Sequence, residues 1–333
     1  MTDDEFKKLL KKHGYDGSKL PEGLKVEGVL DLQSCTGLTS LPKGLTVGVY
    51  LDLEGCTGLT ALPKGLKVGD SLDLEGCTGL TALPKGLKVE GDLYLTYCTG
   101  LTSLPKDLFV GEYLSLFGCT ELTSLPNGLK IDRDLDLEGC TGLTALPNGL
   151  KVGESLDIRD CTALTSLPKG LKVGDSLDLE GCTGLTSLPK DLFVGRNLFI
   201  DSHHVVHEGV KADTYYISNV FVPEALAKRR LEYNEFRQLD AEQRQVWIRM
   251  VGVEWLIKNA KPKILDVDAH KINGHRALML VLSGRTRYCI LVCGDPSTGR
   301  VYYMEVPPKT KTCQEADAYL NLGLDQRQQV GRT

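Results

Sequence analysis

Residues 62–82 read LPKGLKVGDSLDLEGCTGLTA, and residues 83–103 read LPKGLKVEGDLYLTYCTGLTS. Both segments start with Leu-Pro and contain the run Leu-x-Leu-x-x-Cys-x-x-Leu. The unit returns at a fixed interval without insertion or deletion, so that nine coils begin at positions 20, 41, 62, 83, 104, 125, 146, 167 and 188. A strict repeat of this length predicts a solenoid, because no single coil can bury its apolar face alone.

Within a coil, Leu72-Asp73-Leu74 alternates with period two, which predicts a short strand whose leucines point inward and whose aspartate points outward. Stacked strands then form a parallel sheet. The return through Pro63 and Gly65 is too short for a helix, since proline removes a backbone donor and glycine permits a tight bend. We therefore expect an irregular return side.

These leucine and cysteine positions resemble the leucine-rich repeat family, whose unit reads L-x-x-L-x-L-x-x-N/C-x-L. The resemblance covers about residues 20 to 206. The chain departs from the family pattern at Val68, four residues before the first strand leucine, and in having two residues rather than one after the cysteine. The resemblance implies a leucine-rich repeat solenoid with short parallel strands on a concave side and an irregular convex side.

The chain has 11 cysteines among 333 residues, and eight of them mark the repeat. One inward thiol per coil predicts a buried ladder of weak hydrogen-bond donors. We expect these thiols to be reduced, and a metal along the ladder is not expected, because metal sites need several ligands that converge on one point. The ladder consists of Cys35, Cys56, Cys77, Cys98, Cys119, Cys140, Cys161 and Cys182.

Two outward columns follow the strands. The first is Asp31, Asp52, Asp73, Tyr94, Ser115, Asp136, Asp157, Asp178 and Phe199, and the second is Gln33, Glu54, Glu75, Thr96, Phe117, Glu138, Arg159, Glu180 and Asp201. Eleven carboxylates against one arginine predict a face that attracts cations or basic partners. The alternative is a solvated face that was copied along with the repeat.

Coils four and five break the acidic pattern with aromatic side chains, which are typical binding anchors. The alternative is drift among the copies, because exposed single apolar residues are ordinary. We take this region and its acidic flank as the candidate partner-binding site: Asp92, Tyr94, Thr96, Tyr97, Tyr113, Ser115, Phe117, Asp136 and Glu138.

The sequence predicts three parts. Thr2 and Glu5 form a capping box for a short helix over residues 2–13, within an N-terminal cap of residues 1–19. The nine coils occupy residues 20–207, and a second domain occupies residues 208–333. Residues 1–203 carry a net charge of −9 and residues 204–333 a net charge of +4, together −5. This bias is too weak to indicate nucleic-acid binding.

The second domain is predicted to be α+β. Its expected elements are an extended stretch at 214–222, a helix from Pro223 to about Leu239, and a second helix capped by Asp240 and Gln243 with Val246, Trp247, Met250, Val253, Trp255 and Ile257 in its core. Strands at 263–268, 277–282, 288–293 and 301–306 and a short helix from Thr312 through Leu320 complete it.

This domain is similar to an uncharacterised bacterial domain that follows leucine-rich repeats and ends in a V-P-P-x-x-x-T-x-x-E-A segment. The residues concerned are Val306-Pro307-Pro308 and Lys311-Thr312-Cys313-Gln314-Glu315-Ala316. The resemblance covers roughly residues 240 to 333 and implies no known activity.

Two groups of residues suggest chemistry. Cys293-Gly294-Asp295 matches the Cys-x-Asp of bacterial leucine-rich-repeat ubiquitin ligases, although those enzymes have a different repeat and a larger helical domain. Cys293 is thus a weak candidate nucleophile with His270 or His275 as base, and the alternative is a core thiol. A histidine group, His203, His204 and His207, suggests zinc, but His203 lies on the ladder position of a closing coil. We expect no metal and no cofactor.

The expected function is a bacterial protein-interaction module that binds a protein or peptide, favouring a basic one, on the acidic concave face. The alternative is an effector-like enzyme, such as a Cys-dependent ubiquitin-ligase-like or other protein-modifying activity, with its chemistry in residues 208–333. The N-terminus lacks an apolar signal core, and no run of about 18 apolar residues occurs, so a cytoplasmic location without membrane or nucleic-acid partners is expected.

Overall fold

The computed structural model describes residues 22–228, residues 239, 240, 242, 243, 246, 247 and 250, and four strands between residues 263 and 306, the last by their backbone alone. The predicted N-terminal helix over residues 2–13, the rest of the cap 1–19 and the helix from Thr312 lie outside the described residues. The chain divides into two compact units, Met1–Asn219 and Val220–Thr333.

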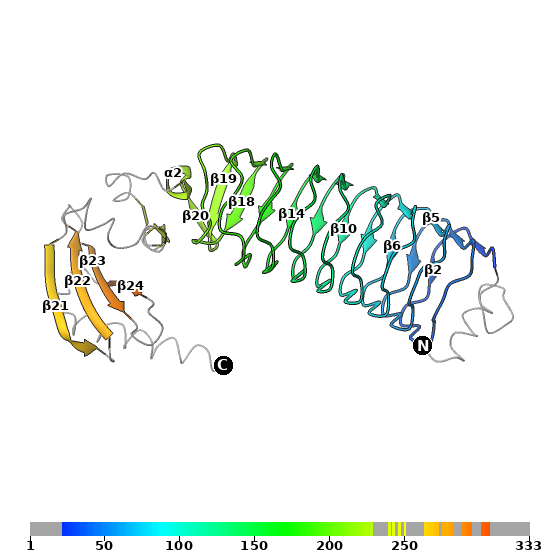
Figure 1. Ribbon diagram of the computed structural model, residues 1–333, viewed down its shortest axis with the longest axis horizontal. Coiled ribbons are helices and arrows are strands. Elements are labelled where there is room, and N and C mark those ends of the chain that lie inside the picture. The colour runs from blue at the N-terminus through cyan, green and yellow to red at the C-terminus, as the bar shows by residue number, and fades with distance from the viewer. Residues whose placement is uncertain are drawn as a thin grey trace. The chain divides into compact units, whose positions relative to one another are not determined.

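The first unit is a parallel β-solenoid whose coils keep the period of the sequence repeat (Figure 1). In most coils two strands of two residues are separated by a three-residue corner. The first series is β1 Lys25–Val26, β3 Thr46–Val47, β5 Lys67–Val68, β7 Lys88–Val89, β9 Phe109–Val110, β11 Lys130–Ile131, β13 Lys151–Val152, β15 Lys172–Val173 and β17 Phe193–Val194. The second series is β2 Leu30–Asp31, β4 Leu51–Asp52, β6 Leu72–Asp73, β8 Leu93–Tyr94, β10 Leu114–Ser115, β12 Leu135–Asp136, β14 Leu156–Asp157, β16 Leu177–Asp178, β18 Asn197–Ile200 and β19 Thr214–Ile217.

In the second series each strand pairs in parallel with the equivalent strand of the next coil, and the first series forms two parallel sheets, β1 to β9 and β11 to β17. In the second series Leu72 lies opposite Leu93 and Asp73 lies opposite Tyr94, and in the first series Val68 lies opposite Val89. Up to β18 the register step equals the repeat length, so equivalent residues form columns along the solenoid. The predicted parallel strands of the second series and the predicted outward columns are confirmed. The first series was not predicted: it lies on the return after the Pro-Gly bend, which was expected to be irregular, and there an inward residue such as Val68 is buried and pairs with its equivalent Val89.

Inside the coils, leucines and cysteines form the core. Leu72, Leu74 and Cys77 are fully buried, and the equivalent residues of the other seven coils that carry a ladder cysteine are buried likewise. All eight ladder cysteines are free. In the seven coils from Cys56 to Cys182, the thiol donates a hydrogen bond of 2.9 to 3.2 Å to the main-chain carbonyl oxygen 24 residues earlier. The thiol therefore links each coil to the previous one, as a buried weak donor.

This burial predicts unreactive thiols. Burial raises the pKa of Cys119 to about 12, and that of Cys161 to the same value, so neither forms the nucleophilic thiolate at neutral pH. We expect the eight ladder cysteines of the native protein to remain unalkylated. In the same reaction time, the cysteines of the protein unfolded in guanidinium should react completely. Peptide mass spectrometry after iodoacetamide treatment measures this. Native labelling of a central thiol such as Cys98 would contradict it.

The solenoid continues past residue 207, where the Leu-Pro and cysteine markers end. Strand β19 pairs in parallel with β18 over four residues, from Asn197 opposite Thr214 to Ile200 opposite Ile217. Tyr215 and Ile217 are buried and Thr214 and Tyr216 are not, so the inward and outward alternation of the earlier strands is kept. The extended stretch predicted at 214–222 is thus two strands, with β19 in the solenoid.

The closing coil differs from the prediction at the ladder. His203 is exposed, and His204 is fully buried in the interior instead. The backbone shows the shift: His204 N–H donates to the Asp201 carbonyl oxygen at 3.2 Å, as Cys182 N–H donates to that of Leu179. The assignment of His203 to the ladder was therefore wrong by one residue, because the coil after β18 holds an extra residue before its inward position.

The second unit begins with β20 Val220–Val222 and α2 Glu224–Ala227. The predicted capping box is present: Gln243 N–H donates to Asp240 Oδ1 at 2.8 Å, and Asp240 N–H donates to Gln243 Oε1 at 3.2 Å. Val246, Trp247 and Met250, which follow at helical spacing, are buried.

Four antiparallel strands follow in chain order: β21 Lys263–Ile272, β22 His275–Leu282, β23 Tyr288–Gly294 and β24 Val301–Val306. The four strands predicted in this region are all present, and the first of them extends beyond its predicted end to Ile272. No helix among the described residues has the length and apolar character needed to cross a bilayer.

Candidate partner-binding face

The outward residues of the second strand series form one face, which we call the acidic face. Its first column runs in register from Asp31 through Tyr94 and Ser115 to Phe199, with one residue per strand. The second column lies two residues further along each coil. Since neighbouring strands are about 4.8 Å apart, the side chains of one column lie close enough to interact between coils.

The aspartates of the first column have a structural task. Asp73 Oδ1 accepts a hydrogen bond from the backbone N–H of Glu75 at 2.8 Å, and the bonds from Glu138 N–H to Asp136 and from Glu180 N–H to Asp178 have the same form at 3.0 Å. The aspartate thus satisfies a backbone donor where the chain leaves the strand. This structural role explains why the aspartate recurs from coil to coil, which its charge alone does not explain.

The carboxylates of this face lie close together and are partly buried, and both effects destabilise their ionised form. Burial raises the pKa of Asp178 to about 6; the N–H bond from Glu180 opposes this rise, and the nearby charges of Asp157 and Glu180 add to it. Burial likewise raises the pKa of Asp52 and of Asp136. A cation on this face would relieve the repulsion.

One cation is already built in. The Arg159 guanidinium pairs with Asp157 at 2.6 Å, with Glu138, and with Asp178 at 3.8 Å. It neutralises part of the acidic face in coils six to eight. The carboxylates of coils two and three, Asp52, Asp73 and Glu75, have no arginine or lysine partner among the described residues.

Four rings interrupt the carboxylates in coils four and five, and we call them the aromatic cluster: Tyr94, Tyr97, Tyr113 and Phe117. The Tyr94 and Tyr113 ring centres are 5.7 Å apart and those of Tyr97 and Phe117 are 5.0 Å apart, both edge to face. Such pairs hold each other in place and contribute about 0.5–1.5 kcal/mol each.

Hydrogen bonds tie the cluster to its polar neighbours. Tyr94 Oη donates to Asp92 at 3.0 Å and Tyr113 Oη donates to Asp136 at 3.3 Å. The hydroxyls of Thr96 and Ser115 are 2.8 Å apart. The structure therefore brings the nine predicted site residues together on one face: Asp92, Tyr94, Thr96, Tyr97, Tyr113, Ser115, Phe117, Asp136 and Glu138.

Tyr97 combines a bulky ring with a left-handed backbone, which Ser34 and Asp160 also adopt at the same point of their coils. Its φ is 55°, in the left-handed region where Gly76 and Gly139 lie at the same point of their coils. For a bulky residue this conformation costs about 1–2 kcal/mol. The ring is also half exposed, at 50%, and lies over Gly118, where an added Cβ would be 2.6 Å from Tyr97 Cδ1. A strained, exposed aromatic residue is a feature that often marks a functional site.

Sequence reasoning missed Tyr50. Its hydroxyl donates to Asp73 Oδ2 at 2.8 Å. The bond joins a tyrosine to an aspartate of the next coil, as the bond from Tyr113 to Asp136 does. Tyr50 precedes Tyr113 by three repeats and so occupies the same column. Comparison of equivalent positions outside the strands would have found it.

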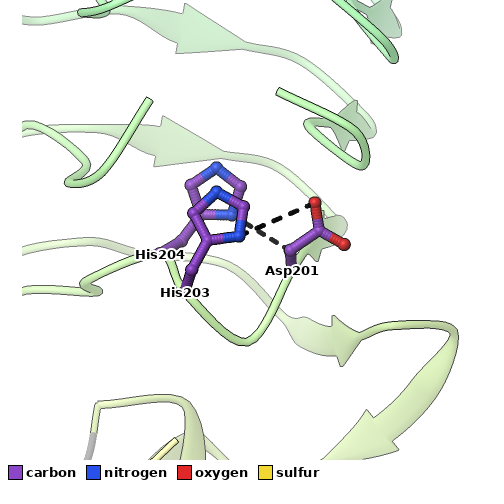
Figure 2. Close-up of side chains that lie close together, drawn as sticks. All are labelled: Asp201, His203 and His204. Carbon is purple, nitrogen blue, oxygen red and sulfur yellow. Dashed lines mark hydrogen bonds and ion pairs between the residues drawn. The ribbon is translucent and has the colours of Figure 1, made fainter. Parts of the chain in front are cut away.

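Figure 2 shows the histidine group at the end of the solenoid. One ligand atom from each of Asp201, His203 and His204 lies within 4.8 Å of the others. However, His204 Nδ1 accepts the Asp201 backbone N–H at 3.0 Å, so its lone pair is in use and the proton is on Nε2. Within the described part of the chain that Nε2 is buried without a partner, and burial lowers the pKa of His204 to about 4. The group is arranged as a neutral packed histidine rather than as a ligand set.

The enzyme hypothesis concerned Cys293 with His270 or His275. Cys293 lies on β23, where its backbone pairs with Ala277 and Tyr302, and His270 lies on β21. His275 begins β22. The side chains of these strands lie outside the described part of the chain, so the enzyme hypothesis stays a prediction.

Comparison with known proteins gave no match: no protein-family model, no curated protein and no solved structure is similar to this chain.

Proposed function

We propose that this chain is a protein-interaction module of the leucine-rich repeat type, which binds a basic protein or peptide on the acidic face with the aromatic cluster as anchor. The single observation that carries the proposal is Tyr97, a half-exposed aromatic ring at a φ of 55° where the two neighbouring coils have Gly76 and Gly118. The Tyr97–Phe117 contact and the backbone strain are of similar size, so folding has little net gain from tyrosine at a position that glycine would occupy without strain.

The chemistry around the aromatic cluster favours a cationic partner. Ring faces attract lysine and arginine side chains, and the column residues on either side of Tyr94 and Ser115 are Asp73 and Asp136. A partner with basic and apolar residues would therefore meet carboxylates at the ends of the site and rings at its centre. Electrostatic attraction of this kind weakens as salt is added.

Tyr97→Gly tests the proposal, because it returns the position to the residue of the neighbouring coils. Relief of the strain and loss of the Tyr97–Phe117 contact oppose each other, so we expect the free energy of unfolding to change by less than about 1 kcal/mol. Binding should weaken about tenfold or more, as expected for an exposed aromatic anchor. The measurement is capture of partners from a lysate of the source organism, followed by titration of the captured partner.

Phe221→Ala is the matched control, because Phe221 is an equally exposed ring, at 51%, that belongs to neither outward column of the acidic face. It should leave capture unchanged. If Tyr97→Gly and the double variant Tyr94→Ala/Phe117→Ala both retained every partner of the folded protein, the acidic face would not be the binding surface.

A further inference from the structure

A second column of charge runs along the other strand series. Its outward residues are, in chain order, Lys25, Thr46, Lys67, Lys88, Phe109, Lys130, Lys151, Lys172 and Phe193. All but Thr46 are exposed, and the repeat places them one per coil, with strand pairing that joins the first five as one sheet and the last four as another. We call this column the lysine strip. Its two phenylalanines are 44% exposed, and the Lys88 ammonium lies 5.0 Å from the centre of the Phe109 ring.

Most lysines of this strip lack the ion pairs that the arginines of the solenoid form, among the residues that the structure describes. Arg133, Arg159 and Arg196 each form an ion pair with a carboxylate of the same chain. Among the described residues, Lys88 is the one member of the lysine strip with an ion pair, to Glu90 at 2.7 Å. Six like charges on a line with a spacing of about 4.8 Å or its multiples repel one another, so the strip is suited to a partner that carries acid groups.

The lysine strip and the first column of the acidic face match coil by coil. Coils one, three, six, seven and eight carry lysine in the strip and aspartate in the acidic column, in the pairs Lys25 and Asp31, Lys67 and Asp73, Lys130 and Asp136, Lys151 and Asp157, and Lys172 and Asp178. Both columns lose their charge in coils five and nine, whereas coil two has Thr46 with Asp52 and coil four has Lys88 with Tyr94. Coil five has Phe109 with Ser115, and coil nine has Phe193 with Phe199.

We infer that the partner of the acidic face is a second copy of this chain, bound through its lysine strip in parallel and in register. The inference rests on the proposed function, since it takes the acidic face as a binding surface. Two copies have the same coil spacing, so once one coil of the first copy is aligned with the equivalent coil of the second, all the other coils are aligned too. Lysine then meets aspartate in five coils, Lys88 meets Tyr94 in coil four, and the rings of coil nine meet each other.

The same geometry determines the kind of assembly. The two strips are different surfaces of one chain, so each copy that joins leaves one lysine strip and one acidic face unoccupied. An interface of this kind is heterologous and continues to grow unless a rotation closes it. We therefore expect a lateral array whose mass rises with protein concentration, rather than a dimer of fixed size.

Sedimentation velocity of the full chain tests this inference. We expect association at about 0.02 M salt and its loss at about 0.5 M, where the Debye length falls to about 4 Å. Lys130→Glu/Lys151→Glu/Lys172→Glu should weaken association at least tenfold, since three attractive pairs become repulsive. Asp136→Asn/Asp157→Asn/Asp178→Asn should also weaken it, and asparagine keeps the Oδ1 that accepts the backbone N–H.

The control is Lys64→Glu/Lys85→Glu/Lys106→Glu, which makes the same change in net charge at exposed lysines outside the strip. It should retain association. A chain that stays monomeric at low salt, or equal losses in the control and the strip variant, would overturn the inference. So would binding of the lysine strip to anionic vesicles or to single-stranded DNA without self-association. Capture of another protein that depends on Tyr97 would in those cases still support the proposed function.

Discussion

Replacement of Gly111 by alanine should lower the free energy of unfolding by about 3 kcal/mol, because the added Cβ has no room. It would lie 1.8 Å from the carbonyl oxygen of Glu90 and 2.8 Å from the carbonyl carbon, both backbone atoms of the previous coil. No rotamer change can relieve this overlap. The two coils would have to separate at the hydrogen bond from Gly111 N–H to the Val89 carbonyl oxygen, now 3.0 Å. Urea unfolding followed by circular dichroism measures the loss.

Gly128→Ala is the matched control, because it adds backbone strain without the steric overlap of Gly111→Ala. Gly128 has a φ of 74° and nothing within 4 Å of an added Cβ, so alanine there is strained but does not collide, at a cost of about 1 kcal/mol. Equal urea midpoints for the two variants would mean that coil spacing does not limit the solenoid. The result also concerns function, because Gly111 lies in coil five against coil four, and these two coils carry the aromatic cluster.

The second large effect is on the pH dependence of stability, through His204. Its pKa is lowered to about 4 by burial, below the ordinary value of about 6.5. Between these values the unfolded chain binds a proton that the folded chain does not, so stability is lost as the pH falls from 6.5 to 4. For a fully buried ring the loss approaches about 3 kcal/mol.

His204→Asn should remove this loss, because the asparagine Oδ1 can accept the Asp201 N–H and does not titrate. Asp178 acts in the opposite direction: its raised pKa, about 6, makes the folded state gain stability as the pH falls. The informative quantity is therefore the difference between the wild type and the variant, measured by urea unfolding at neutral and at acid pH. His203→Asn should reduce the loss only in part, because it removes the neighbouring charge that adds to the lowering of the His204 pKa and leaves the burial of His204 in place. A wild type and a His204→Asn variant with parallel pH profiles would show that His204 is not the group responsible.

Much of the solenoid could be predicted from the repeat alone. A constant period without gaps requires that equivalent residues align in columns, so the buried thiol ladder and the position of the aromatic cluster followed from the chain. The capping box of Asp240 and Gln243 is local, and for that reason it too was predictable. The shift from His203 to His204 was not, because it depends on how the chain closes the last coil after the markers end.

What the sequence by itself determined is therefore the order of residues around each coil and along each column, since that order depends only on the period. The tertiary structure alone decided what the columns do. It showed that the aspartates satisfy backbone donors, that Tyr97 lies in a left-handed conformation, and that the described lysines of the strip have few ion pairs where the arginines are paired. These properties depend on distances between coils and on backbone angles, which arise only when residues one repeat apart are packed side by side.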